Sequence, residues 1–320
     1  RDVPLAGRPG PARLGRLARY CAGFDLVLTY NWGAIDAVMA RRMFGGPPLI
    51  HHEDGFNQDE IARQNPVRVM WRRFALPAAQ RLIVPSQLLQ AIAGSSWRQP
   101  ADRIVRIANG IPVDRFAGAP EADAIPGFRR APDELVVGTL AGLRAVKNLP
   151  RLVRAFASAA RQSARPMRLV IVGEGSERAR ILATADAEGV ADRLLIPGFL
   201  PDPARYIGHF DIFALSSDSE QAPISLVEAM ATGLPVVATS VGDVVAMVSP
   251  ENSAFVVPAD DEAGFAQAIA TVAAGEALRQ RLGAANRRHA GANFREEGMI
   301  AAYRSAYSAA LGDEMALGRA

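Results

Sequence analysis

The chain alternates short apolar runs with longer segments in which apolar residues recur every three or four positions. The short runs in the first third have the length of buried strands and lie at residues 25–30, 48–52, 81–86 and 103–110. The segments between them have helical spacing and lie at residues 33–44, 59–76 and 87–97. This alternation predicts βαβ units, in which helices cover both faces of a parallel sheet.

A second series of the same kind follows residues 118–133, a segment rich in proline, alanine and glycine that has the composition of a linker. Its predicted strands lie at residues 135–140, 168–173, 193–198, 211–217, 234–240 and 253–257. Its predicted helices lie at residues 149–161, 176–187, 225–232, 261–273, 276–289 and 295–311. The chain has 320 residues, enough for two domains of ~150 residues each.

We therefore predict an α/β fold of two Rossmann-like, doubly wound domains. Residues 1–118 form the first domain and residues 119–292 the second, and residues 293–320 form a helix that packs back toward the first. In folds of this kind, ligands bind at the carboxyl ends of the strands.

Composition narrows the class of protein. No apolar run of the sequence reaches the ~18–20 residues that span a bilayer, and the chain does not open with the basic and apolar stretch of a secretory signal. The only cysteine, Cys21, excludes an intramolecular disulfide and is typical of the reducing cytoplasm. We therefore expect a cytoplasmic location and assign Cys21 no role.

The net charge of +3 hides an uneven distribution. Residues 1–118 hold 16 arginines and 9 acidic residues, a net charge of +7, whereas residues 119–320 hold 20 basic and 24 acidic residues, a net charge of −4. A basic half can attract a nucleic acid, an anionic substrate or an anionic membrane. The alternative is a solvated surface in a proteome that favours arginine.

Of the 36 basic residues, 35 are arginine and only Lys147 is lysine. Where arginine serves for every general positive charge, a single lysine indicates a place that requires a compact ammonium instead of a planar guanidinium. Chance retention is the alternative. Lys147 is therefore a candidate functional residue, to be weighed with its neighbours.

Two glutamates flank the expected start of the helix at residues 225–232. Glu220 lies in the polar loop that follows a strand, and Glu228 lies just over one turn into the helix, while Pro223 suits a first turn and Gly233 a helix end. N–H groups at a helix start bind anions or hydroxyl oxygens, and two carboxylates beside them suit a sugar and a ribose. An acidic helix start followed by an exposed helical glutamate explains the same spacing.

Residues 216–243 resemble the Glu-x7-Glu motif of retaining GT-B glycosyltransferases, particularly those of family 4. The likeness includes EAMATGLPVVAT, the helix and strand after the second glutamate. It implies that Glu220 contacts hydroxyls of the transferred sugar and that Glu228 contacts the ribose of the nucleotide. It also implies that the sugar and a phosphate are held by the backbone between them, at Gln221, Ala222, Pro223, Ile224 and Ser225.

The segment VVGTLAGLRAVKNLPRLVRAF, residues 136–156, resembles the strand, glycine-rich loop and helix of the same family. The resemblance places Lys147 at the basic position that binds the donor diphosphate, where a charged partner stabilises the leaving group. This agrees with the solitary lysine. The family usually has an arginine five residues before that lysine, where this chain has Gly142, so we expect Arg144 to reach the same phosphates instead.

Two further turns carry candidates for nucleotide contacts. RLVIVGEGSER, residues 168–178, places Gly173 and Gly175 between a strand and a helix, but Arg178 stands where a dinucleotide fingerprint has its third glycine. By the resemblance, this turn lies near the nucleotide. LIPGFLPD, residues 195–202, resembles the loop that receives the base, which makes Phe199 and Leu200 candidates for base contacts; core packing is the alternative for Phe199.

In the first domain, PLIHHEDGF, residues 48–56, resembles the loop that carries a cleft-facing histidine in many relatives. Aligned on Gly55, the position of that histidine holds Asp54, and His51 and His52 come just before it. We predict that Asp54 or His52 contacts the substrate. The alternative is that the histidine pair serves packing or capping at a strand end.

The resemblance extends over about residues 24–311, and the strand and glycine-rich loop with which relatives begin have no counterpart. The chain opens with Arg1 on a polar stretch rich in proline and glycine. We therefore expect an N-terminally truncated GT-B protein whose first domain lacks one strand–helix unit, and which binds donor but transfers poorly.

The resemblance implies a bacterial retaining hexosyltransferase of polysaccharide biosynthesis, with a nucleotide-diphosphate sugar (a UDP-sugar) as donor and a saccharide or lipid-linked acceptor. No Asp-x-Asp metal motif follows a strand, so we expect no metal and no cofactor besides the donor substrate. The alternatives are a nucleotide-sugar epimerase of the same architecture, a nicotinamide-dependent dehydrogenase and a non-catalytic module that binds sugar nucleotides.

One predicted helical stretch combines arginines with aromatic residues, at Arg63, Arg68, Trp71, Arg72, Arg73 and Phe74. Such a stretch can touch an anionic membrane, which suits a lipid-linked acceptor. The alternative is a solvated face with Trp71 in the core. We expect no nucleic acid as a partner, because no nucleic-acid-binding motif accompanies the charge.

Overall fold

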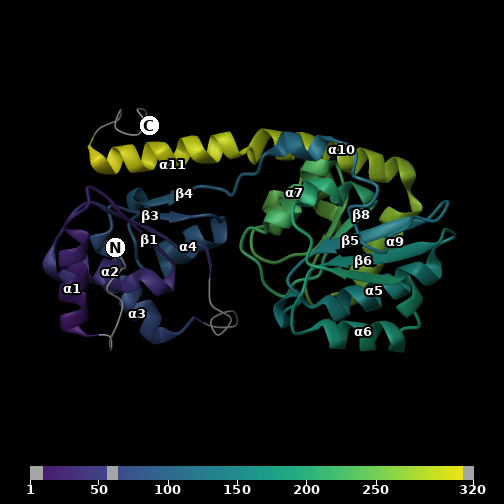
Figure 1. The fold of residues 1–320 in the computed structure, drawn as a ribbon, viewed down its shortest axis with the longest axis horizontal. Coiled ribbons are helices and arrows are strands. Elements are labelled where there is room, and N and C mark those ends of the chain that lie inside the picture. The colour runs from purple at the N-terminus through teal and green to yellow at the C-terminus, as the bar shows by residue number, and fades with distance from the viewer. Residues whose placement is uncertain (1–9, 56–63, 313–320) are drawn as a thin grey trace. The chain divides into compact units, whose positions relative to one another are not determined.

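The computed structural model describes residues 10–55 and 64–312 and divides into two compact units (Figure 1). Unit 1 comprises residues 1–108 and 298–320, and unit 2 comprises residues 109–297. Each unit contains one parallel sheet covered by helices. The predicted α/β architecture is therefore confirmed.

Unit 1 contains a four-stranded sheet in the order β1-β2-β3-β4, and all of its strand pairs are parallel. The strands are β1 (Val27–Tyr30), β2 (Leu49–His52), β3 (Arg81–Val84) and β4 (Ile104–Arg106). They follow chain order, so within the described part of unit 1 the sheet contains no point at which the order reverses. Residues after each strand reach the same edge of the sheet, because the strands are parallel.

Helices cover both faces of this sheet. They are α1 (Pro11–Cys21), α2 (Ile35–Phe44), α3 (Pro66–Ala75), α4 (Gln87–Ser95) and the greater part of α11 (Glu296–Leu311). One face is covered by a core that includes Leu17, Met39 and Trp97. On the other face, Ile50 and Ile83 pack against α11. Residues 59–63 of the predicted helix at 59–76 lie outside the described residues.

Helix α1 was not predicted, because its three arginines and Gly15 interrupt a narrow apolar stripe. Pro11 stands in its first turn, where a missing N–H costs nothing. Leu14 and Leu17, three residues apart, are buried, and Arg13 on another face pairs with Asp36 of α2 at 2.9 Å. The opening stretch is thus helical from Pro11 onward instead of irregular.

Unit 2 contains a six-stranded parallel sheet in the order β10-β9-β8-β5-β6-β7. The strands are β5 (Leu135–Leu140), β6 (Met167–Val172), β7 (Leu194–Gly198), β8 (Ile212–Leu215), β9 (Val236–Thr239) and β10 (Val256–Val257). The chain runs outward from β5 through β6 to β7, then returns to the other side of β5 with β8. This reversal makes unit 2 doubly wound, with its switch point between β5 and β8.

The helices of unit 2 are α5 (Leu149–Gln162), α6 (Arg178–Ala187), α7 (Ile224–Thr232), α8 (Val244–Met247), α9 (Glu262–Ala274) and α10 (Glu276–Asn293). On one face of the sheet, the main core joins α5, α6 and α9 through side chains such as Phe156, Ile181 and Phe265. Figure 1 shows α7 and α10, which pack against each other, on the opposite face. Both faces of the sheet are therefore covered.

The segment at residues 118–133 is irregular, as expected of a linker, but it belongs to unit 2. Ile125 and Phe128 are buried, and the Glu121 carboxylate accepts two hydrogen bonds from Arg205, at 2.9 and 2.6 Å. The preceding 3-10 helix η5 (Val113–Ala117) packs against α7. The change between units therefore falls at residues 108 and 109, and the domain bounds predicted at residues 1–118, 119–292 and 293–320 stay predictions.

Candidate functional site

Two loops meet at the switch point of unit 2. The loop after β5 carries Lys147, and the loop after β8 carries Glu220. Because β5 and β8 are parallel neighbours, both loops emerge at the carboxyl edge of the sheet. Ligands of open α/β sheets bind in the crevice at this kind of position.

The structure brings Lys147 and Glu220 into direct contact. The Lys147 Nζ donates a hydrogen bond to the Glu220 Oε1 at 2.6 Å, and the Ser217 Oγ donates to the same oxygen at 2.6 Å. The side chains of Lys147 and Glu220 are 16% and 10% exposed. An ion pair with this little exposure is poorly screened by salt, so each charge strongly orients the other.

A second set of polar contacts holds the two loops together. The Asp218 carboxylate accepts hydrogen bonds from the Asn148 side chain, at 3.1 and 3.2 Å, and pairs with Arg151 at 2.8 Å. The Asp218 backbone N–H donates to the Val146 carbonyl at 2.8 Å. Asn148 itself has left-handed backbone angles and caps α5 through the Arg151 N–H. Four residues beside Lys147 and Glu220 thus fix where the two loops meet.

Sequence reasoning missed these supporting residues. Val146 and Asn148 lie in the loop after β5, Asp218 lies in the loop after β8, and Arg151 lies in the first turn of α5. Finding them from sequence requires knowing that β5 and β8 are neighbours in the sheet, although these two strands are not consecutive along the chain. Only the strand order supplies this information.

The loop after β9 packs against the Glu220 loop and supports it. Gly242 has a φ of +54°, and a Cβ at this position would lie 2.2 Å from the Glu220 carbonyl oxygen. The Asp243 N–H donates to the Gln221 carbonyl at 3.0 Å, and the Thr239 Oγ1 donates to the Ser217 carbonyl at 2.6 Å. Glycine at 242 is therefore required for this close approach.

Helix α7 begins at Ile224, so Pro223 stands just before the helix in an extended conformation and not in its first turn. The Ala222 carbonyl accepts a hydrogen bond from the Asn109 side chain at 3.3 Å. Gln221, Ala222 and Ser225 are half-buried at this helix start. The expected contact of these residues with a donor stays a prediction.

Glu228 is half-buried on α7, which contradicts the alternative of an exposed helical glutamate. Burial, with a smaller contribution from the negative charge of Asp202, raises the pKa of Glu228 to about 7. Burial and then the charge of Glu228 also raise the pKa of Tyr206. Glu228 therefore lies in a partly desolvated cluster with Asp202 and Tyr206, and the contact with a ribose stays a prediction.

Gly173 and Gly175 are explained by backbone packing beneath the Lys147 loop. Their φ angles are +149° and +155°, and a Cβ would lie 1.9 Å from the Ala141 carbonyl oxygen and 2.4 Å from that of Leu143, respectively. These approaches let the loop after β6 support the loop after β5. The predicted proximity of this turn to a nucleotide is not tested by the fold.

Arg144 and Gly142 are both exposed at the tip of the Lys147 loop. A Cβ at Gly142 would lie 3.6 Å from the Arg144 Nε, so the Arg144 side chain occupies the space beside Gly142. This geometry is compatible with the expectation that Arg144 substitutes for an arginine at position 142.

Phe199 and Leu200 follow β7. The Phe199 side chain is 73% exposed, which contradicts the alternative that it packs in the core. The Leu200 carbonyl accepts a hydrogen bond from the Tyr206 hydroxyl at 3.3 Å, which ties this loop to the neighbourhood of Glu228. Contact of either side chain with a base stays a prediction.

In unit 1, His52 is buried at the end of β2. Its Nδ1 lies 3.0 Å from the Thr29 carbonyl oxygen and its Nε2 lies 2.9 Å from the Tyr307 hydroxyl, while its ring stacks on Tyr30. Burial is the largest cause of a lowered pKa for His52, which favours the neutral ring. These contacts favour the packing alternative for His52. Asp54 is exposed, its backbone N–H donates to the Asn31 side chain at 2.7 Å, and its predicted substrate contact remains open.

His51, Glu53 and Arg72 form a buried polar cluster that the sequence did not reveal. The Arg72 Nη2 donates to the Glu53 Oε1 at 2.8 Å, and the His51 Nε2 lies 3.2 Å from the other carboxylate oxygen. Burial alone would raise the pKa of Glu53, but hydrogen bonds from His51 and Arg72 and the charge of Arg72 outweigh it and lower the pKa. The Arg72 guanidinium also lies over the rings of Trp32 and Trp97, at 5.2 and 4.8 Å from their centroids.

The burial of Arg72 corrects two expectations for the helix at residues 66–75. Arg72 belongs to the core and does not reach the surface, whereas Trp71 is exposed and does not pack in the core. Arg63 lies outside the described residues. The helix nevertheless exposes an apolar stripe, and α2, which packs against it, exposes two more apolar residues at its end. This α2–α3 apolar patch consists of Met43, Phe44, Val67, Met70, Trp71 and Phe74, each at least 37% exposed.

The described residues offer neither a metal site nor a membrane span. No group of three or more His, Cys, Asp or Glu side chains between residues 10–55 and 64–312 is placed to hold a metal ion. Among the helices of this described part, none combines the length and apolarity needed to cross a bilayer.

Comparison with known proteins agrees with the strand order and the motifs. Residues 122–289 match the model of the family Glycosyl transferases group 1, and residues 2–115 match that of Glycosyltransferase Family 4. The chain is 26% identical over 284 residues to a D-inositol 3-phosphate glycosyltransferase of Saccharomonospora viridis, covering 83% of this chain and 66% of that protein. It is 30% identical over 192 residues to a GDP-mannose-dependent alpha-mannosyltransferase of Mycobacterium tuberculosis, covering 59% and 46%. The chain thus spans about half to two thirds of the length of these curated relatives.

Solved structures share the fold. A sucrose-phosphate synthase from Thermosynechococcus elongatus matches with a TM-score of 0.76 and 24% identity, covering 93% of this chain and 79% of that one. HepE of Anabaena, solved in complex with UDP, matches with a TM-score of 0.79 and 20% identity, covering 93% and 82%. These likenesses support the GT-B architecture. With family models matching both halves of the sequence, the chain belongs to the Glycosyl transferases group 1 family and carries the GT-B fold of family 4 glycosyltransferases.

Proposed function

We propose that this protein transfers a hexose from a nucleotide-diphosphate sugar to a saccharide or lipid-linked acceptor, with retention of the anomeric configuration and without a metal ion. The observation that carries this proposal is the Lys147–Glu220 pair at the switch point of unit 2. The pair puts a cation suited to phosphates beside a carboxylate suited to hydroxyls, at the carboxyl edge of the sheet. Membership of a glycosyltransferase family supports the choice of reaction.

The diphosphate is the leaving group, and its stabilisation falls to Lys147, Arg144 and the start of α7. In the pair described above, Lys147 is neutralised by Glu220. A diphosphate carries more negative charge than one carboxylate, so an arriving donor draws the ammonium away from Glu220. The positive end of the α7 dipole, near Ala222 and Ser225, adds to the same stabilisation as negative charge grows on the departing oxygen. These groups supply the positive charge for which other transferases use a metal ion.

The same exchange frees Glu220 to accept hydrogen bonds from hydroxyls of the transferred sugar. Glu228 accepts from the ribose hydroxyls when it is ionised, and Phe199 and Leu200 contact the base, because an exposed aromatic ring beside the site offers a stacking surface. UDP is the proposed nucleotide, since HepE was solved with UDP and with UDP-glucose. No protein nucleophile takes part in this scheme.

The acceptor side is proposed for unit 1, where Asp54 is exposed at the carboxyl end of β2. A lipid-linked acceptor suits a protein that docks on an anionic membrane from the cytoplasm. The α2–α3 apolar patch supports this, because exposed arginines accompany it. Arg42 lies over the ring of Phe74, at 5.5 Å from the centroid, and Arg73 is exposed on the same helix as Phe74. Aromatic side chains accompanied by arginine are suited to the headgroup region of such a membrane. No nucleic acid is proposed as a partner.

A donor assay with product analysis tests the proposal. The protein is incubated with a panel of UDP-hexoses and acceptors in excess EDTA, and NMR of the product gives its anomeric configuration. We expect a retained product and unchanged turnover in EDTA. Complete loss of turnover in EDTA would remove the metal-independent scheme. Release of an epimerised sugar nucleotide without acceptor would assign an epimerase, and binding without transfer or hydrolysis would assign a non-catalytic module.

A further inference from the structure

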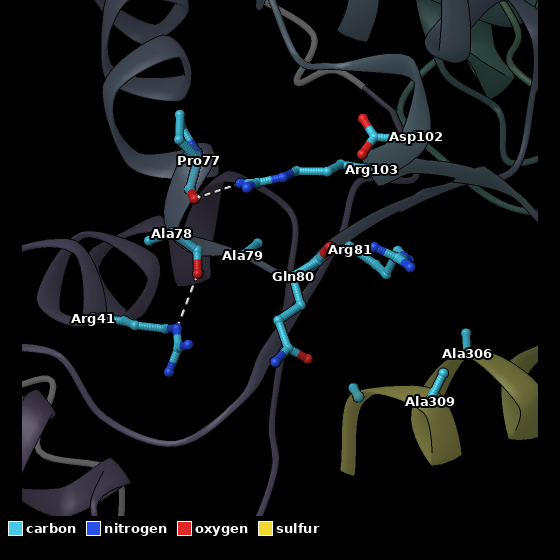
Figure 2. A pocket seen from close by; sticks show the side chains of 11 residues that line it. Arg41, Pro77, Ala78, Ala79, Gln80, Arg81, Asp102, Arg103, Ala306 and Ala309 are labelled. Carbon is cyan, nitrogen blue, oxygen red and sulfur yellow. Dashed lines mark hydrogen bonds between the residues drawn. The ribbon is translucent and has the colours of Figure 1, made fainter. Parts of the chain in front are cut away.

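Unit 1 contains a cavity at the end of its sheet opposite to His52 and Asp54. It has a volume of about 540 Å³ and lies beside the residues that lead into β3 and β4, not beside those that follow the strands (Figure 2). Its polar lining comes from Arg41 at the end of α2, Gln80 and Arg81 before and at the start of β3, and Asp102 and Arg103 before β4. This position separates the cavity from the carboxyl edge of the same sheet, where the acceptor side was proposed.

Backbone carbonyls of one short segment hold the three arginines in place. The Arg41 Nε donates to the Ala78 carbonyl at 2.9 Å, and the Arg103 Nη1 donates to the Pro77 carbonyl at 2.9 Å; Figure 2 shows both guanidinium groups reaching this segment. Arg41 also donates to the Gly46 carbonyl, and the Arg81 Nη1 donates to the Gln80 carbonyl at 3.1 Å. Each guanidinium has five N–H donors, so these bonds fix the groups and leave most donors available.

The positive charge of this cavity is not compensated. Carbonyls accept hydrogen bonds but carry no net charge, and none of the three arginines forms an ion pair with a carboxylate in the described part of the chain. Among the described residues that line the cavity, Asp102 is the only acid, against three guanidinium groups. Burial lowers the pKa of Arg41, which shows that its charge is partly desolvated. Arg72, buried in the same unit, has Glu53 as its counter-charge.

The other residues that line the cavity have small side chains, which leave space for a ligand. Ala78 and Ala79 line one side, and α11 contributes Ala306, Ala309 and Ala310. No large side chain among the lining residues fills the cavity, whose volume lies within the range of ~300–1,000 Å³ that is usual for small-molecule sites. The guanidinium fork matches phosphate oxygens in pairs.

We propose that this cavity is a second ligand site, which binds a phosphate-bearing small molecule or headgroup through Arg41, Arg81 and Arg103. Three cations against one carboxylate favour an anion with more than one negative charge over a monocarboxylate. The inference goes beyond the proposed transfer reaction, because the cavity lies at the other end of the strands from the acceptor side. Free phosphates and lipid headgroups share this chemistry.

Calorimetry with inorganic pyrophosphate tests the site at constant ionic strength. The measurement uses protein that carries both Lys147→Gln and Arg144→Gln, so that the two cations of the proposed donor site do not contribute. We expect one site per chain and a dissociation constant that rises about tenfold or more when Arg41→Gln or Arg103→Gln is added, since each removes a charge-assisted hydrogen-bond donor. Arg19→Gln, an exposed arginine on α1, is the matched control and should leave binding unchanged.

Arg81→Gln is the variant least expected to disturb folding, because within the described residues the Arg81 side chain bonds only to the carbonyl of its neighbour Gln80. Its melting temperature should match that of the control, while its pyrophosphate binding falls by a similar factor. The proposal is overturned if pyrophosphate fails to bind at matched ionic strength, or if all three substitutions bind as tightly as the control. A short-chain phosphatidic acid, measured in parallel, identifies the source: tighter binding than pyrophosphate assigns a lipid headgroup, and equal or weaker binding assigns a free phosphate.

Discussion

The Lys147 ammonium and the Glu220 carboxylate lie 2.6 Å apart although 73 residues separate them in the chain. Each is held by a loop that follows a strand, and these strands are neighbours only because the strand order of unit 2 reverses at β5. In the proposed function, the phosphates of a sugar diphosphate bind the ammonium and the sugar hydroxyls bind the carboxylate. It is the starting point for the first prediction.

Replacing Lys147 by Gln removes the ammonium and keeps a hydrogen-bond donor. We expect kcat/KM for sugar transfer to fall by about 10²–10³-fold, the usual effect of removing one group that stabilises charge in the transition state. Lys147→Arg should recover only part of this, because a planar guanidinium does not fit the place of a compact ammonium. Arg161→Gln on the exposed surface of α5 is the control for loss of one positive charge. An unchanged kcat/KM in Lys147→Gln contradicts the assigned role.

Glu228 makes stability and donor binding depend on pH. Its pKa in the folded protein is about 7, against 4.5 when unperturbed. The folded state therefore holds a proton that the unfolded state has lost between these values, so stability is greatest at low pH and is lost as the pH rises through about 7. A shift of this size corresponds to at most about 3 kcal/mol.

Glu228→Gln should abolish this dependence, because glutamine stays neutral. We expect the melting temperature of Glu228→Gln to equal that of the parent near pH 5 and to exceed it near pH 8. UDP affinity of the parent, measured by calorimetry, should increase from pH 6 to pH 8 as the carboxylate ionises and accepts from the ribose, whereas Glu228→Gln and Glu228→Ala bind UDP weakly throughout. Equal UDP affinity in parent and Glu228→Ala would remove the ribose role.

Glu53 and Arg72 should stabilise unit 1 only as a pair. Arg72→Met leaves the Glu53 charge buried without its partner, and we expect a loss of about 3–5 kcal/mol in the free energy of unfolding. Glu53→Gln combined with Arg72→Met should be less destabilising than Arg72→Met alone, because no buried charge is left. Urea unfolding of the two variants measures the difference. A double variant that is less stable than Arg72→Met would show that the Glu53–Arg72 pairing is not the main contribution of these residues to the free energy of unfolding.

The α2–α3 apolar patch should bind vesicles that contain anionic lipid. We expect cosedimentation with phosphatidylcholine–phosphatidylglycerol vesicles, weaker binding to pure phosphatidylcholine, and a decrease with added salt. Replacing Trp71 and Phe74 together by serine should lower the partition coefficient more than tenfold, since each buried ring contributes about 1.5–3 kcal/mol. Leu182→Ser, an exposed apolar residue on α6, is the control. Equal binding of the Trp71 and Phe74 variant and this control argues against docking through the patch.

Much of the fold and part of the site could be predicted from local pattern. The alternation of strands and helices and the position of Glu220 at a helix entrance depend on residues close together in the chain, and Lys147 was singled out by the composition of the whole chain. Helix α1 escaped prediction because only Leu14 and Leu17 form its buried stripe. For Gly173 and Gly175, the sequence suggested a nucleotide turn, while the folded backbone supplies a packing reason.

The sequence by itself determined the α/β class, the two series of βαβ units and the residues that carry charge at the strand ends. Only the tertiary structure decided that β5 lies beside β8, which joins Lys147 to Glu220. It also decided that Arg72 is buried and Trp71 exposed. Helical periodicity indicates which residues share a face of a helix, but which face is buried depends on the residues that pack against it. Here Glu53, His51 and two tryptophan rings surround the Arg72 guanidinium and make its burial favourable.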